Sequence, residues 1–276
     1  MPAQLRQFGD TAPAAAPPRR LLQELCAARP GERPRRSART VRAGPRHRAS
    51  SRRGIRVERR GYPGTVIIGI DTSLGTAVAA IARDGEIAAD EQSANPLGHA
   101  EVIGDLLARA VAAAPEPTHV AIGMGPGPFT GLRVGIATAR AFALGRGIPV
   151  VPVPSHDGVA LGVLLADALT GTETPRFAVV TDARRREFAY SVYDGIDDDG
   201  LPIRVGDATL SPRDELDARL AEAGAARYDA TSVSAAMIAL AAARALDAGR
   251  ELAGPEPLYL RSPDVVAAHA PKRVSA

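Results

Sequence analysis

The chain has little or none of several residue types, and each shortage excludes a class of protein. Among 276 residues there is one cysteine, Cys26, so an internal disulfide framework and a cysteine-based metal site are both excluded. There is no Trp, aromatic residues make up 4% of the chain, and no apolar run reaches the roughly 18 residues of a membrane-spanning helix. We therefore expect a reduced, cytoplasmic protein that does not contact a membrane and is long enough to bury a sizeable core.

Lysine is nearly absent too, and the basic charge is concentrated at one end. Lys272 is the only lysine, whereas residues 1–64 contain 16 Arg and four acidic residues, a formal charge of +12. The remaining residues contain 18 basic and 27 acidic residues, a formal charge of −9, so the net charge of +3 combines two dissimilar parts. The first part is rich in Arg, Pro and Ala and lacks helical or strand periodicity, so we expect residues 1–63 to be disordered.

Three interpretations of this extension remain open. Its charge suits an RNA-binding arm, its Arg-rich and acid-poor composition suits an organelle transit peptide, and an Arg-biased coding region with a mis-assigned start would look the same. Because it contains no continuous apolar stretch, we expect no secretory signal peptide.

After residue 64 the pattern changes to short apolar runs that alternate with amphipathic segments. Strands are predicted over 66–70, 76–81, 86–91, 119–123, 149–153, 176–182, 187–193 and 203–210. Helices are predicted over 99–114, 131–144, 155–168, 212–221 and 231–246. The order of three strands, helix, strand and helix recurs in weaker form, which indicates an α/β fold of two lobes, each with a mixed β-sheet flanked by helices. We expect a first lobe over 64–168 completed by 231–246, a smaller second lobe over 169–230, and a C-terminal tail over 247–276.

The first predicted strand ends in a polar turn formed by Asp71, Thr72, Ser73, Gly75 and Thr76. Hydroxyl groups and a glycine in a tight strand–turn–strand connection can bring backbone N–H groups to a phosphate, with the aspartate holding a metal or a water. The same residues suit a polar β-turn without a ligand. The sequence therefore predicts either a nucleotide-binding turn or a vestige of one.

A glycine-rich segment over 125–131 leads into the second helix, whose N-terminal dipole favours an anion. It lacks the lysine of a Walker loop, and its two prolines lack the amides of a Rossmann loop. The alternative is a rigid turn before a tightly packed helix, with Thr130 as the N-cap. That helix has a row of small residues, and its few charges leave it apolar on nearly all sides. We expect its own sheet to cover one side and a partner protein to cover the other.

Three further clusters invite a chemical interpretation. Ser155, His156 and Asp157 contain the residue types of a hydrolase triad, but three consecutive residues cannot converge on one reacting atom, so we expect Ser155 to be a helix N-cap. His99 has no second histidine at metal-ligand spacing, so we expect no metal site and no catalytic residues. The basic cluster of Arg184, Arg185 and Arg186 could meet RNA phosphates, meet a partner's carboxylates, or form an exposed hairpin tip.

From about residue 65 to 263 the chain resembles the TsaB (YeaZ-type) family of bacterial tRNA modification. The matching stretches are IIGIDTSLGTAVAAI, GHAEVI, IGMGPGPFTGLRVGIATARAFALGRGIPVVPV, TDARRREFAY and PLYLRSP. The resemblance implies an ASKHA (actin/Hsp70/sugar-kinase-like) fold of two lobes. It also implies a role in forming threonylcarbamoyladenosine beside the anticodon of tRNAs that read codons beginning with A.

The same resemblance implies a partner subunit of TsaD, joined by TsaE, that reaches tRNA through the complex and can form a homodimer when alone. Threonylcarbamoyl-adenylate, ATP and a metal would serve the complex, the metal in TsaD, and no cofactor would bind this chain directly. TsaD has a paired-histidine metal motif on the helix that matches residues 99–114, whereas only His99 is present here. We therefore expect a scaffold that is not catalytic alone.

The two helices over 99–114 and 131–144 are the expected interface with TsaD. The residues expected there are His99, Val102, Ile103, Leu106, Gly131, Arg133, Gly135, Ile136, Ala139 and Arg140. A bulky side chain at Gly135 or Ala139 is expected to abolish co-purification with TsaD while the monomer stays folded.

Two alternatives remain. An ATP-dependent kinase or ATPase of the same fold would require Asp71, Thr72 and Ser73 to hold Mg-ATP. A metallopeptidase of the M22 grouping would require a metal pair or a nucleophile–base pair, and the sequence offers neither.

Overall fold

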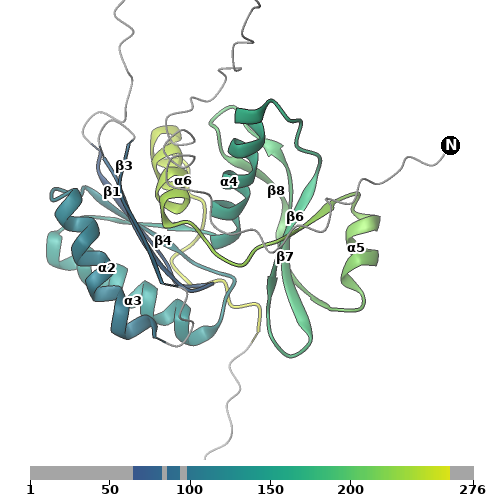
Figure 1. The fold of residues 1–276 in the computed structure, drawn as a ribbon, viewed down its shortest axis with the longest axis horizontal. Coiled ribbons are helices and arrows are strands. Elements are labelled where there is room, and N and C mark those ends of the chain that lie inside the picture. Colours follow the sequence, from purple (N-terminus) through teal and green to yellow (C-terminus); the bar gives the residue numbers. More distant parts are fainter. Residues whose placement is uncertain (1–64, 83–85, 94–97, 262–276) are drawn as a thin grey trace, which may run out of the picture.

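Two mixed β-sheets, each with helices on both faces, form the two lobes of the molecule (Figure 1). The computed structural model describes residues 65–82, 86–93 and 98–261, so the expectations for the N-terminal extension and for Lys272 lie outside the described residues. The first sheet has the strand order β3-β2-β1-β4-β5, and the second has the order β8-β7-β6-β9. The predicted α/β fold class, with a mixed sheet in each lobe, is confirmed.

The first sheet pairs antiparallel strands on one side of β1 and parallel strands on the other. Its strands are β1 (Ile67–Asp71), β2 (Thr76–Ile81), β3 (Ile87–Ser93), β4 (His119–Gly123) and β5 (Val150–Val153). β1, β2 and β3 are successively antiparallel, while β1, β4 and β5 are parallel. The nearly continuous apolar sequence of β1 follows from this central position, because both of its faces are covered.

Two helices cover one face of this sheet and a third covers the other. α2 (His99–Ala113) and α3 (Phe129–Arg146) pack on Ile68 and Ile70 of β1, whereas α6 (Ala235–Ala248) packs on Ile67 from the opposite side. Side chains of a strand alternate between its two faces, so the apolar residues of β1 contribute to the hydrophobic core on each face of the sheet.

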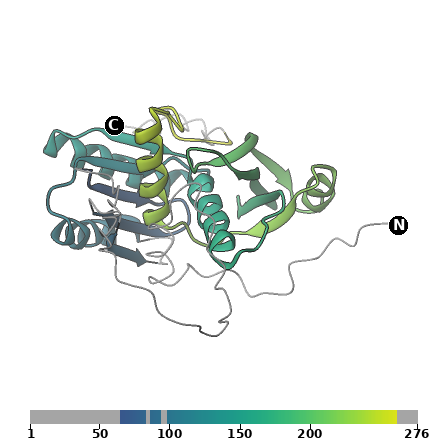
Figure 2. The same cartoon turned by 90° about the horizontal axis from the view of Figure 1, so that it is seen from above.

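The second sheet repeats the order and direction of the first four strands. It consists of β6 (Phe177–Asp182), β7 (Glu187–Ile196), β8 (Pro202–Pro212) and β9 (Ala226–Asp229). β6, β7 and β8 are successively antiparallel, and β9 is parallel to β6. α5 (Leu216–Glu222) covers one face, and α4 (Ser155–Thr170) covers the other. Since α4 also packs on α6, these two helices lie between the lobes (Figure 2).

Several predicted boundaries are wrong because neighbouring segments decide them. α3 begins at Phe129 after an extended Pro128, so Thr130 lies inside the helix and does not cap it. Ser155 is the first residue of α4, and its hydroxyl turns toward β1. α5 begins at Leu216 instead of 212, since β8 continues to Pro212. β9 was not predicted because a four-residue segment with two charges gives no strand signal.

In the described part of the chain, no helix has the length and apolar character needed to cross a membrane.

Candidate functional site

The polar turn after β1 is closed by hydrogen bonds from its own chain. Asp71 is 1% exposed, and its Oδ1 accepts hydrogen bonds from the Ser73 N–H at 2.8 Å and the Ser73 hydroxyl at 2.6 Å. Its Oδ2 accepts the Ser155 hydroxyl at 2.6 Å, and Ser155 Oγ in turn accepts the Gly125 N–H at 3.0 Å. Burial raises the pKa of Asp71 above its usual range, although the hydrogen bonds from Ser155 and Ser73 act in the opposite direction.

The glycine-rich loop after β4 packs directly on this turn. A Cβ at Gly123 would lie 1.8 Å from Asp71 Oδ2, and a Cβ at Gly127 would lie 2.8 Å from the Cβ of Ser73. Glycine is required at both positions because the two segments approach so closely. A side chain at Gly127 would therefore collide with Ser73.

The remaining polar residues of the turn bind the two helices on the same face of the sheet. The Thr72 hydroxyl donates to the Gly131 carbonyl at 2.8 Å, and Thr76 Oγ1 lies 2.8 Å from Nδ1 of His99. Both threonines are buried. The turn that the sequence presents as nucleotide-loop-like therefore ties β1 and β2 to α2 and α3.

Most of the expected partner-facing residues point into the core of this chain. The buried ones are His99, Ile103, Leu106, Gly131, Gly135, Ile136 and Ala139. A Cβ at Gly135 would lie 2.2 Å from Oγ1 of Thr72, and Ala139 is 0% exposed. The expectation that either residue could take a bulky side chain in a folded monomer is wrong, because the row of small residues packs on the β1 turn and the core.

Arg133 and Arg140, also expected at the partner interface, contact the C-terminal segment over 249–261. Nε of Arg133 donates to the Tyr259 hydroxyl at 3.1 Å, and its guanidinium lies over the Tyr259 ring. Arg140 donates to the Pro255 carbonyl. The segment is held further by the Leu258 N–H, which donates to the Met124 carbonyl at 2.8 Å.

The outward face of α3 carries a different row, which the sequence reasoning missed. Ala137, Ala141 and Leu144 recur at helical spacing and are exposed, Leu144 by 85%. Val102 on α2 is half-buried. A helix that is apolar on nearly all sides gives no sequence signal for which row of residues faces the sheet, so the expected interface names the row that is buried.

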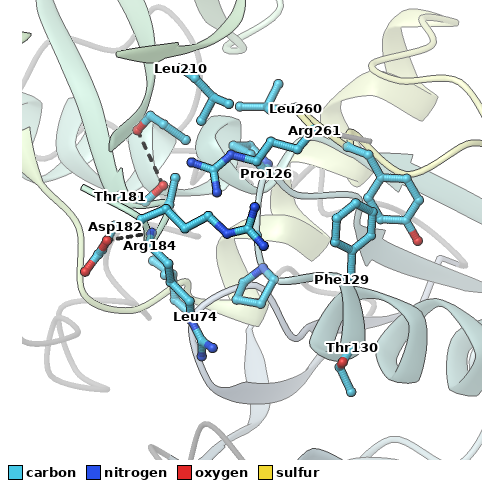
Figure 3. Close-up of a pocket in the computed structure, with 16 residues that line it drawn as sticks. Leu74, Pro126, Phe129, Thr130, Thr181, Asp182, Arg184, Leu210, Leu260 and Arg261 are labelled. Carbon is cyan, nitrogen blue, oxygen red and sulfur yellow. Dashed lines mark hydrogen bonds between the residues drawn. The ribbon is translucent and has the colours of Figure 1, made fainter. Parts of the chain in front are cut away.

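A cavity of about 270 Å³ lies between the loop after β4 and the hairpin that joins β6 to β7 (Figure 3). It is lined by Leu74, Pro126, Gly127, Pro128, Phe129, Thr130, Thr181, Asp182, Ala183, Arg184, Arg185, Ala189, Leu210, Tyr259, Leu260 and Arg261. Arg184, Arg185 and Arg186 form the hairpin tip and are exposed, and the first two line the cavity.

The apparent triad is divided among three separate contacts. Ser155 binds Asp71, whereas Nδ1 of His156 lies 2.9 Å from Ser191 Oγ and its Nε2 lies 3.0 Å from Thr181 Oγ1. Complete burial, together with the charge of Arg204, lowers the pKa of His156 to about 3. This histidine is therefore neutral and fixed between α4 and the second sheet.

Asp157 makes the neighbouring contact between the lobes. Its Oδ1 accepts the Tyr193 hydroxyl at 2.7 Å and lies 3.6 Å from Nε of Arg204. Burial raises the pKa of Asp157, an effect that the positive charge of Arg204 partly offsets. Ser155, His156 and Asp157 thus attach the start of α4 to β1, β6 and β7 and do not converge on a common point.

Comparison with known sequences gives a consistent set of relatives. A family described as TsaD, tRNA N6-adenosine threonylcarbamoyltransferase, matches residues 97–269. The uncharacterized protein Rv3421c of Mycobacterium tuberculosis (strain ATCC 25618 / H37Rv) is 33% identical over 208 residues, covering 72% of this chain and 93% of that protein. The tRNA threonylcarbamoyladenosine biosynthesis protein TsaB of Escherichia coli (strain K12) is 29% identical over 131 residues, covering 46% of this chain and 54% of that protein.

Comparison with solved structures supports the fold. YeaZ from Pseudomonas aeruginosa superposes with a TM-score of 0.56 at 21% identity, covering 71% of this chain and all of that chain. A second structure, of a Pseudomonas aeruginosa protein with similarity to peptidase YeaZ, has a TM-score of 0.58 at 22% identity with the same coverage. The two-lobed ASKHA-type arrangement expected from the resemblance is confirmed by these matches.

Proposed function

Because this chain belongs to the family of tRNA threonylcarbamoyladenosine proteins that includes TsaD, as a TsaB (YeaZ)-type member, we propose that it is a non-catalytic partner of TsaD. Its role lies in tRNA threonylcarbamoyladenosine biosynthesis. In the proposed complex, TsaD and TsaE act with this subunit to transfer the threonylcarbamoyl group to the adenosine beside the anticodon. The tRNAs concerned are those that read codons beginning with A.

The observation that carries the non-catalytic role is the closed turn after β1. Asp71 accepts three hydrogen bonds from serines of its own chain, and Thr72 donates to the Gly131 carbonyl. A kinase or ATPase would need these groups to face Mg-ATP. Breaking a buried network of this kind would leave polar groups without partners, at a cost of roughly 1–3 kcal/mol for each neutral group.

A docking surface for TsaD is supported by the outward face of α3. A leucine that is 85% exposed on a helix, with Ala137 and Ala141 in line with it, offers a flat apolar strip that another helix can approach closely. We assign the contact with TsaD to this row, formed by Ala137, Ala141 and Leu144. The inward row that contains Gly135 and Ala139 acts only indirectly, by seating α3 on the sheet.

The experiment that tests the role is a reconstituted modification assay with TsaD, TsaE, tRNA and the threonylcarbamoyl-adenylate donor. The modified nucleoside, measured by mass spectrometry, is expected to form when this chain is present and to fall to background when it is left out. Equal product with and without the chain would overturn the proposal. Robust ATP turnover by the chain alone would instead favour the kinase or ATPase alternative.

A further inference from the structure

The hairpin tip between β6 and β7 carries positive charge on a body that is acidic. After residue 64 the chain has 18 basic and 27 acidic residues, a formal charge of −9. Arg184, Arg185 and Arg186 nevertheless follow one another at the tip, and all three are exposed. A body of negative charge repels a polyanion, so a polyanion that reaches this body is drawn to the tip.

The acidic residues of the same hairpin do not cancel the charge of the tip. Oδ1 of Asp182 lies 2.8 Å from a guanidinium nitrogen of Arg213, and Glu187 pairs with Arg261. Each of these carboxylates is therefore matched by an arginine from outside the hairpin. The positive charges of the three tip arginines remain in excess.

The tip has arginines where the backbone favours glycine or asparagine. The Glu187 N–H donates to the Arg184 carbonyl at 3.0 Å, which closes a β-turn, and the φ values of the three tip residues are 62°, 51° and 63°. Hairpin turns with positive φ at both central positions strongly favour Asn and Gly, because other side chains are strained there. Strain of this kind is typical of functional sites, so the side chains themselves have a use.

The backbone of the tip is held in place by its neighbours. The Arg184 N–H donates to Oδ1 of Asp182 at 2.8 Å, and the Arg213 N–H donates to the Arg186 carbonyl at 3.0 Å. The guanidinium of Arg213 also lies over the ring of Phe188, 5.0 Å from its centroid. A tip that is fixed in this way loses little backbone freedom when it binds.

The tip is distant from the surface assigned to TsaD. Arg184 and Arg185 line the same cavity as Phe129, the first residue of α3. Leu144, at the far end of the outward row, follows Phe129 by 15 residues, which is about 22 Å along a helix that rises 1.5 Å per residue. A partner helix on the outward row therefore lies toward the opposite end of α3 from the tip.

We propose that the hairpin tip contacts the phosphate backbone of the tRNA, so that this subunit holds the tRNA directly. The identity of the RNA rests on the proposed function. A nucleic-acid backbone offers one phosphate at every nucleotide, which three adjacent arginines can bind together, whereas carboxylates on a protein surface have no such regular spacing. Guanidinium groups bind phosphate through paired, charge-assisted hydrogen bonds. The contact positions the tRNA and does not read its sequence.

The salt dependence of tRNA binding by the full chain tests this proposal. Fluorescence anisotropy of labelled tRNA gives the affinity between about 50 and 200 mM salt, and each arginine–phosphate contact adds roughly 0.7–0.9 to the slope of log K against log salt. The tip variant combines Arg184→Gly, Arg185→Gly and Arg186→Gly. Its slope should be shallower by about two, and its affinity about tenfold lower or more.

A matched control separates the tip from net charge. The control variant lowers the charge by the same amount at exposed arginines elsewhere, through Arg109→Ala, Arg176→Ala and Arg219→Ala. Its slope and affinity should be those of the parent chain, because exposed charges beyond about 8 Å are largely screened at physiological salt. Residues 1–64 are the same in all of these proteins, so their own contribution to binding is common to them.

Two further measurements separate a tRNA contact from a change in folding. Glycine adopts the left-handed backbone without strain, so the tip variant should melt no lower than the parent chain. In the reconstituted assay with TsaD and TsaE, the tip variant should raise the KM for tRNA and leave kcat unchanged. A variant with lysine at the three tip positions keeps the charge and should keep most of the salt slope.

The proposal is overturned if the parent chain does not bind tRNA saturably, or if the tip and control variants have equal slopes. Loss of TsaE capture by the tip variant, with tRNA binding unchanged, would assign the tip to an acidic protein partner instead. The titrations use this chain without TsaD. Their failure is therefore distinct from an absence of TsaD binding, which would contradict the proposed function.

Discussion

At the scale of single residues, the distance from a glycine to the atoms packed against it decides whether a larger residue can replace it. Gly104 and Gly135 are both helical glycines, and they differ in what a methyl group would meet. A Cβ at Gly135 would lie 2.2 Å from Thr72 Oγ1, whereas a Cβ at Gly104 would have no heavy atom within 4 Å. The sequence presents both as glycines in helices and offers no sign of this difference, because the contact partner Thr72 lies 63 positions before Gly135.

The first prediction compares alanine at these two positions. Gly135→Ala should lower the free energy of unfolding by about 1–3 kcal/mol, because the added methyl overfills a packed contact. Gly104→Ala should raise it by about 0.5–1 kcal/mol, because alanine costs less backbone entropy in an exposed helix. Urea denaturation of both variants measures the difference. A Gly135→Ala variant as stable as the parent chain would show that the turn and α3 are not in contact as described.

At the scale of secondary-structure elements, α4 is held to the second sheet by a buried neutral histidine. His156 has its pKa lowered to about 3, whereas the ordinary value for histidine is 6.5. The unfolded chain therefore takes up a proton near pH 6.5 that the folded chain does not take up until about pH 3. Stability from this residue is complete above pH 6.5 and is lost as the pH falls, by about 1.4 kcal/mol per pH unit.

The second prediction concerns His156→Gln, which keeps hydrogen-bonding groups near Ser191 and Thr181 and does not titrate. Between pH 7 and pH 5 the parent chain should lose about 2 kcal/mol of unfolding free energy more than the variant. Urea midpoints at the two pH values measure this difference, and the buried carboxyls are common to both proteins. Parallel pH profiles would mean that His156 is not buried in its neutral form.

The C-terminal segment gives the third prediction, at the same scale. Tyr259→Ala removes the ring that contacts Phe129 and accepts a hydrogen bond from Arg133. Without these contacts, local opening of the C-terminal segment costs less free energy. The Leu258 amide, which donates to the Met124 carbonyl, should therefore exchange its hydrogen about tenfold faster or more. Tyr228→Ala on β9 is the control, and equal exchange at Leu258 in the two variants would contradict the described packing.

Element positions followed from the sequence wherever hydrophobic periodicity was strong. β2 was predicted with its observed bounds, and α2 was predicted within one residue of its observed end. The predictions failed where tertiary contacts override local signals. Ser155 looks like an N-cap, yet its hydroxyl binds Asp71 on a strand 84 positions earlier. The polar β1 turn could be located from the sequence, but its closed hydrogen bonds depend on Ser155 and Gly125 and could not be foreseen.

At the scale of the whole molecule, the helices of the first lobe have two sides with different uses. The inward row of α3 packs on the β1 turn, while the outward row of Ala137, Ala141 and Leu144 is exposed. The second lobe contributes its arginine-bearing hairpin to the cavity between the lobes. The fold thus keeps its nucleotide-loop-like turn closed and leaves an apolar helix face on its surface, in agreement with the proposed partner role.

The most direct test of this account is the affinity of purified TsaD for a matched pair of surface variants. Ala141→Arg places a charged side chain in the outward row of α3, and Ala221→Arg places the same side chain on the exposed face of α5 in the second lobe. Both should melt within about 2 °C of the parent chain, because surface substitutions usually change stability by less than about 0.5 kcal/mol. We predict that Ala141→Arg weakens TsaD binding by tenfold or more, roughly 1.4 kcal/mol, while Ala221→Arg binds like the parent chain. Equal binding by the two variants, or no TsaD binding by the parent chain, would contradict the account.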